Sequence, residues 1–182
     1  MKAVRFIPVL MVGLIASACA TTTVDKNMLQ TPAKTYPIVV IGDFNTDDNL
    51  WQSYVARARR GLDTKLMDSK AFTQVVDPGA SPLPANAVVV TGKVTEADKG
   101  STAARWLIGF GAGKAHITAE FQLAEPNGVV LGKFSVRKAY SGGAGIGGAN
   151  LLDMDDLAQQ LGEETANTIV AWAKTGSLQA TR

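Results

Sequence analysis

The stretch 115–140, AHITAEFQLAEPNGVVLGKFSVRKAY, decides the fold. Its first arm alternates apolar and polar side chains over 115–124, and its second arm does so over 129–140. A period of two residues is typical of a strand with one buried face. Turn-forming residues separate the two arms. The pattern therefore predicts an antiparallel β-hairpin with one apolar face and one largely polar face.

The alternation also predicts the register of this hairpin. Apolar side chains stand at odd positions in the first arm and at even positions in the second, and a slip by one residue would turn every side chain to the other face. A four-residue loop over 125–128 satisfies this parity and sets Glu120 opposite Lys133. Extended backwards, the same register sets Gly111 opposite Gly142. A three-residue loop would reverse the parity, so we do not expect it.

The rest of the chain supplies further strands and two helices. We expect Gly42 and Asp43 to end the first strand, and close packing on the sheet to explain Gly61 within a helix. The predicted fold class is a single α/β sandwich over 37–176, followed by a tail over 177–182. Its sheet is mixed and mostly antiparallel, with two helices on one face, in the order β-α-β-β-β-β-α. The elements are a strand over 37–41, a helix over 48–70, strands over 72–76 and 87–95, the hairpin, and a helix over 153–174.

Composition excludes several classes of function. The 182 residues include 18 Lys and Arg against 16 Asp and Glu, so no excess of charge points to nucleic acid. One Cys and one His are too few for a zinc site. We expect no cofactor, and no small-molecule substrate is evident. The apolar share of 46% suits one compact domain and not a disordered chain.

The first residues have the features of an export signal. Lys2 and Arg5 precede an apolar stretch, and small residues stand just before Cys19. The run Ala-Ser-Ala-Cys resembles the bacterial lipobox, in which the Cys becomes the lipidated first residue of the mature protein. We therefore expect a signal peptide over 1–18, then a fatty acyl (palmitate) anchor on Cys19 with a flexible tether over 19–36. The residue after Cys19 resembles the sorting pattern of the outer membrane, so we expect the domain to face the periplasm.

Two short motifs are incomplete versions of known ligand sites. The run 43–47 begins like a calcium loop, but Asp48 stands where that loop needs Gly. Residues 143–148 have the spacing of a dinucleotide-binding turn, but the βαβ unit that this turn requires is missing. The single His, His116, is expected on the polar face of the hairpin near Arg137. Nothing in these patterns favours an enzyme, and we expect none.

A glycine-rich block stands before the hairpin. Residues 105–115 read RWLIGFGAGKA, with Arg105 followed by a Gly-Phe-Gly-Ala-Gly run. This block and the lipobox resemble a family of bacterial lipoproteins classed only as a domain of unknown function. The resemblance covers 37–175 and implies no established activity. The expected strand order is also similar to that of the amino-terminal domain of TolB and of the periplasmic domain of the curli secretion channel.

The leading hypothesis is a non-enzymatic, lipid-anchored envelope protein whose domain binds another protein or copies of itself. The alternative is a subunit of an oligomeric pore or secretion assembly in the outer membrane. The predicted register brings two glycine-rich runs side by side, where we expect either an interface or a pair of mobile loops. The candidate interface residues are Arg105, Trp106, Ile108, Gly109, Phe110, Gly111, Gly113, Gly142, Gly143 and Gly145.

Overall fold

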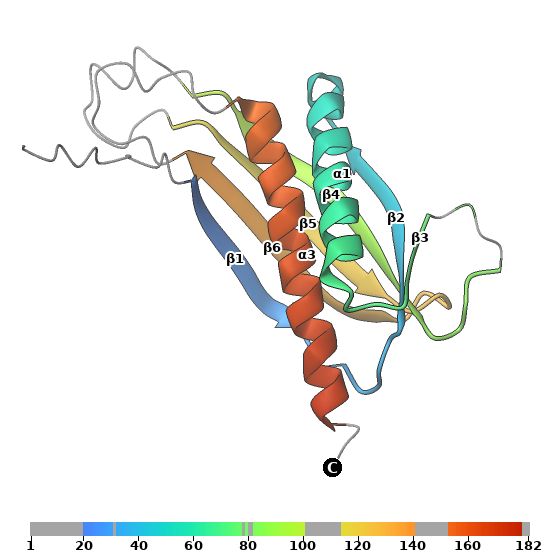
Figure 1. Ribbon diagram of the computed structural model, residues 1–182. Coiled ribbons are helices and arrows are strands. Elements are labelled where there is room, and N and C mark those ends of the chain that lie inside the picture. The colour runs from blue at the N-terminus through green and yellow to red at the C-terminus, as the bar shows by residue number, and fades with distance from the viewer. Residues whose placement is uncertain are drawn as a thin grey trace, which may run out of the picture.

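The computed structural model describes residues 20–30, 32–77, 79, 82–100, 114–140 and 153–179. Six strands form one sheet in the order β1-β6-β5-β4-β2-β3, and helices α1 and α3 lie side by side over one face of it (Figure 1). The predicted α/β sandwich is therefore confirmed. Its elements are β1 (Ala20–Leu29), β2 (Ile38–Thr46), the 3-10 turn η1 (Asn49–Trp51), α1 (Gln52–Ser69), β3 (Gln74–Val76), β4 (Ala87–Asp98), β5 (His116–Ala124), β6 (Val130–Tyr140) and α3 (Met154–Gln179).

The sheet is mixed, and β2 is the strand that makes it so. β2 pairs in parallel with β4 on one side and with β3 on the other, whereas β1, β6, β5 and β4 pair antiparallel. The expected end of the strand at Gly42 and Asp43 is wrong. These residues lie in a β-bulge between Ile41 and Phe44, after which β2 resumes its pairing with β4. A bulge bends the strand without ending its ladder.

The β5–β6 hairpin buries the predicted face of each strand, but its cross-strand partners differ from the predicted register. Odd positions of β5 and even positions of β6 share the buried face, as expected. Glu120, however, lies opposite Ser135 and not opposite Lys133, a shift of two residues. Gly128 adopts φ +88°, and its N–H donates to the Glu125 carbonyl oxygen at 2.9 Å. The Glu125 N–H donates to the Val129 carbonyl oxygen at 2.8 Å, which closes a three-residue loop over 126–128. The expectation of a four-residue loop and against a three-residue one is therefore wrong, because a bulge next to the turn restores the faces of the two strands.

The tether expected over 19–36 is wrong for residues 20–29, which form β1. This strand pairs antiparallel with β6, from Ala20 opposite Tyr140 to Leu29 opposite Gly132. Val24 and Leu29 are only partly buried. Hydrogen bonding to a neighbouring strand, more than apolar burial, therefore orders this polar segment, and the sequence pattern carries no sign of such a partner.

The connection between β1 and β2 is also held against the domain. The Trp172 indole Nε1 donates a hydrogen bond to the Gln30 carbonyl oxygen at 2.6 Å. The Tyr36 ring stacks on Trp172 at a centroid distance of 5.6 Å, and its hydroxyl donates to Glu125 Oε1 at 2.9 Å. The Lys34 ammonium pairs with the same carboxylate at 2.6 Å. These contacts tie the connection to α3 and to the β5–β6 turn.

The second helix begins as predicted, whereas α1 begins at Gln52, after the 3-10 turn η1, and not at the expected residue 48. The Asp48 side chain caps η1 by accepting a hydrogen bond from the Leu50 N–H at 2.8 Å, and α3 follows Asp153, whose carbonyl oxygen accepts from its first turn. The expected end of the second helix near Lys174 is wrong, as is the tail from 177, because α3 continues to Gln179. A single Gly at 176 weakens a helix by only about 1 kcal/mol. None of the helices within the described residues is long and apolar enough to cross a bilayer.

A crossing of small residues brings α1 and α3 together. A Cβ atom at Gly61 would overlap the Gln159 carbonyl oxygen, and one at Gly162 would overlap the Ala58 carbonyl oxygen. Gly61 therefore packs on α3, and the expectation that it packs on the sheet is wrong. Apolar side chains of both helices, such as Leu62 of α1 and Leu161 of α3, are buried in one core cluster with those of the sheet. Such close packing of small residues lets two helix backbones approach and fixes their contact.

Candidate functional site

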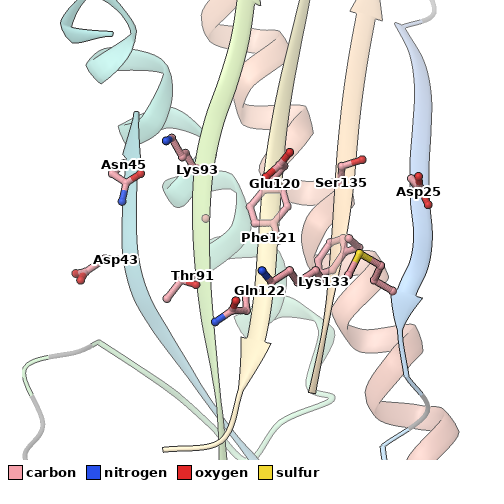
Figure 2. Close-up of a pocket in the computed structure, with 13 residues that line it drawn as sticks. Asp25, Asp43, Asn45, Thr91, Lys93, Glu120, Phe121, Gln122, Lys133 and Ser135 are labelled. Carbon is pink, nitrogen blue, oxygen red and sulfur yellow. The ribbon is translucent and has the colours of Figure 1, made fainter. Parts of the chain in front are cut away.

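One face of the sheet is left uncovered by the helices, and its centre is hollowed. The hollow has a volume of about 680 Å³ and opens to solvent. Figure 2 shows that its polar side chains project from β1, β2, β4, β5 and β6. We call it the open-face hollow. The residues that line it are Asp25, Met28, Asp43, Asn45, Thr91, Gly92, Lys93, Glu120, Phe121, Gln122, Lys133, Phe134 and Ser135.

A row of polar residues runs across this hollow from one edge strand towards the other. The pairing of the strands places Asn45, Lys93, Glu120, Ser135 and Asp25 at one level, one residue from each of five strands. Along the row the residues are in turn neutral, basic, acidic, neutral and acidic. No single sign of charge accumulates on this face. It would therefore match a partner whose surface is polar and of mixed charge.

The second cluster on the open face is centred on Glu96. Its Oε2 accepts hydrogen bonds from Arg137 Nη1 at 2.8 Å and from the Thr118 hydroxyl at 3.2 Å. Its Oε1 lies 2.9 Å from His116 Nε2, a close contact that is not aligned as a linear hydrogen bond. The His116 ring contributes most to lowering the pKa of Glu96, and Thr118 and Arg137 lower it further. The cluster holds one carboxylate in its charged form between two hydrogen-bond donors and the His116 ring.

The Glu96 cluster confirms one prediction and adds a residue that the sequence analysis missed. His116 lies on the polar face beside Arg137, as expected. Glu96 was missed because the expected strand ended at residue 95, whereas β4 passes through a bulge and continues to Asp98. The polar run after the bulge was the available signal for this longer strand.

The described residues show no arrangement that indicates catalysis. The two ring nitrogens of His116 face the Lys114 carbonyl oxygen, at 3.1 Å from Nδ1, and Glu96 Oε1, at 2.9 Å from Nε2. Among the same residues, no group of three or more His, Cys, Asp or Glu side chains could hold a metal ion. Charged groups here pair with one another across strands, as in a structural network.

All ten predicted interface residues lie outside the described residues, as does Cys19. The register predicted for Gly111 and Gly142 also falls there. The described residues that flank both glycine-rich runs do meet at one end of the sheet. The Tyr140 N–H donates to the Ala115 carbonyl oxygen at 2.8 Å, and Asp98 lies opposite His116. β1 starts at this same end, because Ala20 lies opposite Tyr140.

A family model described as a domain of unknown function (DUF4410) matches residues 39–144, which is more than half of the chain. The chain belongs to the DUF4410 family. The predicted membership of a family classed as a domain of unknown function is thereby confirmed. The DUF4410 match runs from β2 past the end of β6 and includes the open-face residues of β4, β5 and β6. β1 and α3 lie outside it.

Solved structures share the fold of this DUF4410 protein. Two PelC dodecamer structures from Paraburkholderia phytofirmans are 14% and 15% identical to the chain, with TM-scores of 0.52 and 0.51. They cover 84% and 82% of this chain and 97% of the PelC chain in each case. No curated protein matches the chain significantly in sequence. The expected similarity to TolB and to the curli channel stays a prediction.

Proposed function

We propose that this protein is a non-enzymatic, lipid-anchored envelope protein that assembles with copies of itself on the periplasmic side of the outer membrane. The observation that carries the proposal is the fold shared with PelC, whose solved structures are dodecamers, over 84% of this chain. Symmetric assemblies of one chain are the commonest oligomers of soluble domains. Self-assembly is therefore the form of protein binding that the fold favours.

The open face supports a binding role over a catalytic one. Its row from Asn45 to Asp25 and the cluster around Glu96 present charges of both signs, held by neighbours on adjacent strands. Preformed polar groups of this kind fix the orientation of a partner surface without chemical change.

The membrane anchor rests on the sequence before the domain. Residues 1–18 have a basic start, an apolar stretch and small residues before Cys19. Acylation of Cys19 would attach the domain to the membrane.

The mass of the native assembly tests the proposal. Full-length protein is extracted from membranes in mild detergent and its mass is measured by native mass spectrometry. We expect a single defined multiple of the protomer mass. A monomer at micromolar concentration in several detergents would contradict self-assembly and leave only binding to a different protein.

A second candidate follows from the same observation. A subunit of an oligomeric pore or secretion assembly would also form a defined oligomer, and it would in addition conduct solutes. Release of a trapped dye from vesicles that contain the purified oligomer separates the two. Vesicles that retain the dye favour the non-enzymatic assembly proposed first. Dye release that requires the intact oligomer favours the pore.

A further inference from the structure

One edge of the sheet is a long strand that pairs with a described strand on its inner side alone. β1 is the terminal strand of the sheet, and only β6 pairs with it among the described residues. It is ten residues long and begins Ala-Thr-Thr-Thr-Val, without Pro. A long, weakly charged edge strand is a template for pairing with another chain unless it is blocked.

The pairing pattern shows which backbone groups of β1 point outwards. The Tyr140 N–H points to β5, since it donates to the Ala115 carbonyl oxygen. Backbone groups of successive residues in an antiparallel strand point to opposite sides. The backbone groups of the preceding residue of β6, Ala139, therefore point to β1, where Ala139 lies opposite Thr21. By the same alternation the backbone groups of Thr22 and Val24 point away from the sheet.

The other edge of the sheet is blocked over only half its length. β3 covers β2 from Ile38 to Val40. Arg59 then donates to the carbonyl oxygens of Ile41 and Gly42, at 3.4 Å and 3.2 Å. Beyond this point no described strand pairs with the outer side of β2, up to its end at Thr46.

The outer edge of β1 and the outer edge of β2 beyond Gly42 run in opposite directions and lie at the same height along the sheet. β1 runs opposite to β6, β5 runs opposite to both β6 and β4, and β2 is parallel to β4, so β1 and β2 run in opposite directions. Pairing also places Val24 and Thr46 in one row across five strands, through Val136, Ala119 and Val94. A second copy set beside the first in the same orientation would bring its β1 antiparallel to the free half of β2.

We propose that copies of this chain join edge to edge, with β1 of one copy pairing antiparallel with the free part of β2, residues 43–46, of the next. This inference rests on the proposed self-assembly and names its contact. The joined edges differ, so the contact is heterologous, and a repeated heterologous contact closes into a ring when its rotation allows. In this register Asp25 of one copy lies opposite Asn45 of its neighbour, both on the open face.

The first test removes one outward N–H. Val24→Pro deletes a donor that β6 does not use, and Pro is tolerated in edge strands. Val24→Ala is the matched control, because it shortens the same side chain and keeps the N–H. We expect Val24→Pro to weaken assembly at least tenfold by native mass spectrometry and dilution, and Val24→Ala to assemble like the wild type.

A second test does not depend on how well the Pro variant folds. Asp25→Cys and Asn45→Cys are combined in the full chain and oxidised in membranes. Figure 2 shows these residues at opposite sides of the open-face hollow. Four strand spacings separate β1 from β2, about 19 Å, which is too far for a disulfide within one chain. We expect a ladder of cross-linked copies from the double variant and none from either single variant.

The outcomes separate this contact from self-assembly itself. A wild-type oligomer whose Val24→Pro variant keeps the same stoichiometry and whose double Cys variant gives no ladder overturns the edge contact alone. If Val24→Pro fails to fold, the ladder decides. A wild-type monomer overturns the proposed self-assembly together with this contact.

Discussion

Gly162 of α3 lies so close to Ala58 of α1 that a Cβ atom at Gly162 would overlap the Ala58 carbonyl oxygen. The same relationship recurs one turn away, between Gly61 and the Gln159 carbonyl oxygen. Both Gly residues are fully helical and buried, so neither is there for its backbone freedom. The contact between the two helices depends on the absence of two side chains.

Gly162→Ala should destabilise the domain, although Ala is the better helix former by about 1 kcal/mol. The added methyl group must push α1 and α3 apart, and overpacking of this kind costs about 1–3 kcal/mol. Urea unfolding measures the effect. Gly79→Ala is the control, because nothing lies within 4 Å of a Cβ atom there. Stabilisation by Gly162→Ala would mean that the helices are not in such close contact.

Trp172→Phe should release the connection between β1 and β2. The substitution keeps an aromatic ring against Tyr36 but removes the donor to the Gln30 carbonyl oxygen at 2.6 Å. Loss of a partly buried hydrogen bond costs about 1–2 kcal/mol. We expect a lower free energy of unfolding and faster tryptic cleavage after Lys34. Unchanged cleavage would show that this hydrogen bond does not order the connection.

Tyr36 should ionise far above the ordinary range of tyrosine. Burial, with the hydrogen bond and the charge of Glu125, raises its pKa from 10.0 to about 12. The folded state therefore favours the neutral phenol, and this stabilisation is present below pH 10 and is lost as the pH rises towards 12. Absorbance at 295 nm should show a step near pH 12 that Tyr36→Phe removes and Tyr54→Phe keeps. Survival of the step in Tyr36→Phe would refute the assignment.

Glu96→Gln should reduce the dependence of stability on acid pH. Contacts with His116, Thr118 and Arg137 lower the pKa of Glu96 from 4.5. The charged carboxylate therefore stabilises the fold above pH 4.5, and this contribution is lost as the pH falls through the lowered pKa. The side chain is half exposed, so the effect should stay below about 1 kcal/mol and shrink in high salt. Identical pH profiles for wild type and Glu96→Gln would contradict the cluster.

Cys19→Ala should move the protein from the membrane fraction to the soluble fraction of the envelope, because the proposed acyl chains are its anchor. Fractionation after a high-salt wash, followed by immunoblotting, measures the shift. Retention of Cys19→Ala in washed membranes would contradict the anchor. Assembly of the released variant would show in addition that self-assembly does not need the membrane.

The sequence predicted elements that bury apolar side chains and missed those that depend on pairing. The strands predicted over 37–41 and 87–95 and the helices predicted over 48–70 and 153–174 are present, because burial leaves a periodic pattern in the sequence. β1 was not readable, since its Thr-rich segment 20–29 gains order from β6, a partner more than a hundred residues away in the chain. An edge strand with little burial leaves almost no pattern.

The hairpin shows what alternation can and cannot determine. Parity of faces followed from the apolar positions, and the structure agrees. The predicted register was wrong by two residues. The tight turn with left-handed Gly128 and the bulge beside it bury the same faces of the two strands as the expected loop would, so the alternation could not distinguish them. Glu96 escaped prediction for a similar reason, as a bulge in β4 carries that strand past its expected end. Bulges change register without changing composition.

β1 begins at Ala20, the residue directly after Cys19, so no linker residues separate Cys19 from the strand. If Cys19 carries the proposed acyl chains, a pull from the bilayer enters the domain along the axis of β1. Hydrogen bonds of an antiparallel ladder lie perpendicular to the strands, so such a pull loads the β1–β6 bonds together, in shear, and does not open them one by one. The strand would then act as a stiff mechanical joint that sets the height and tilt of the whole sheet above the lipid.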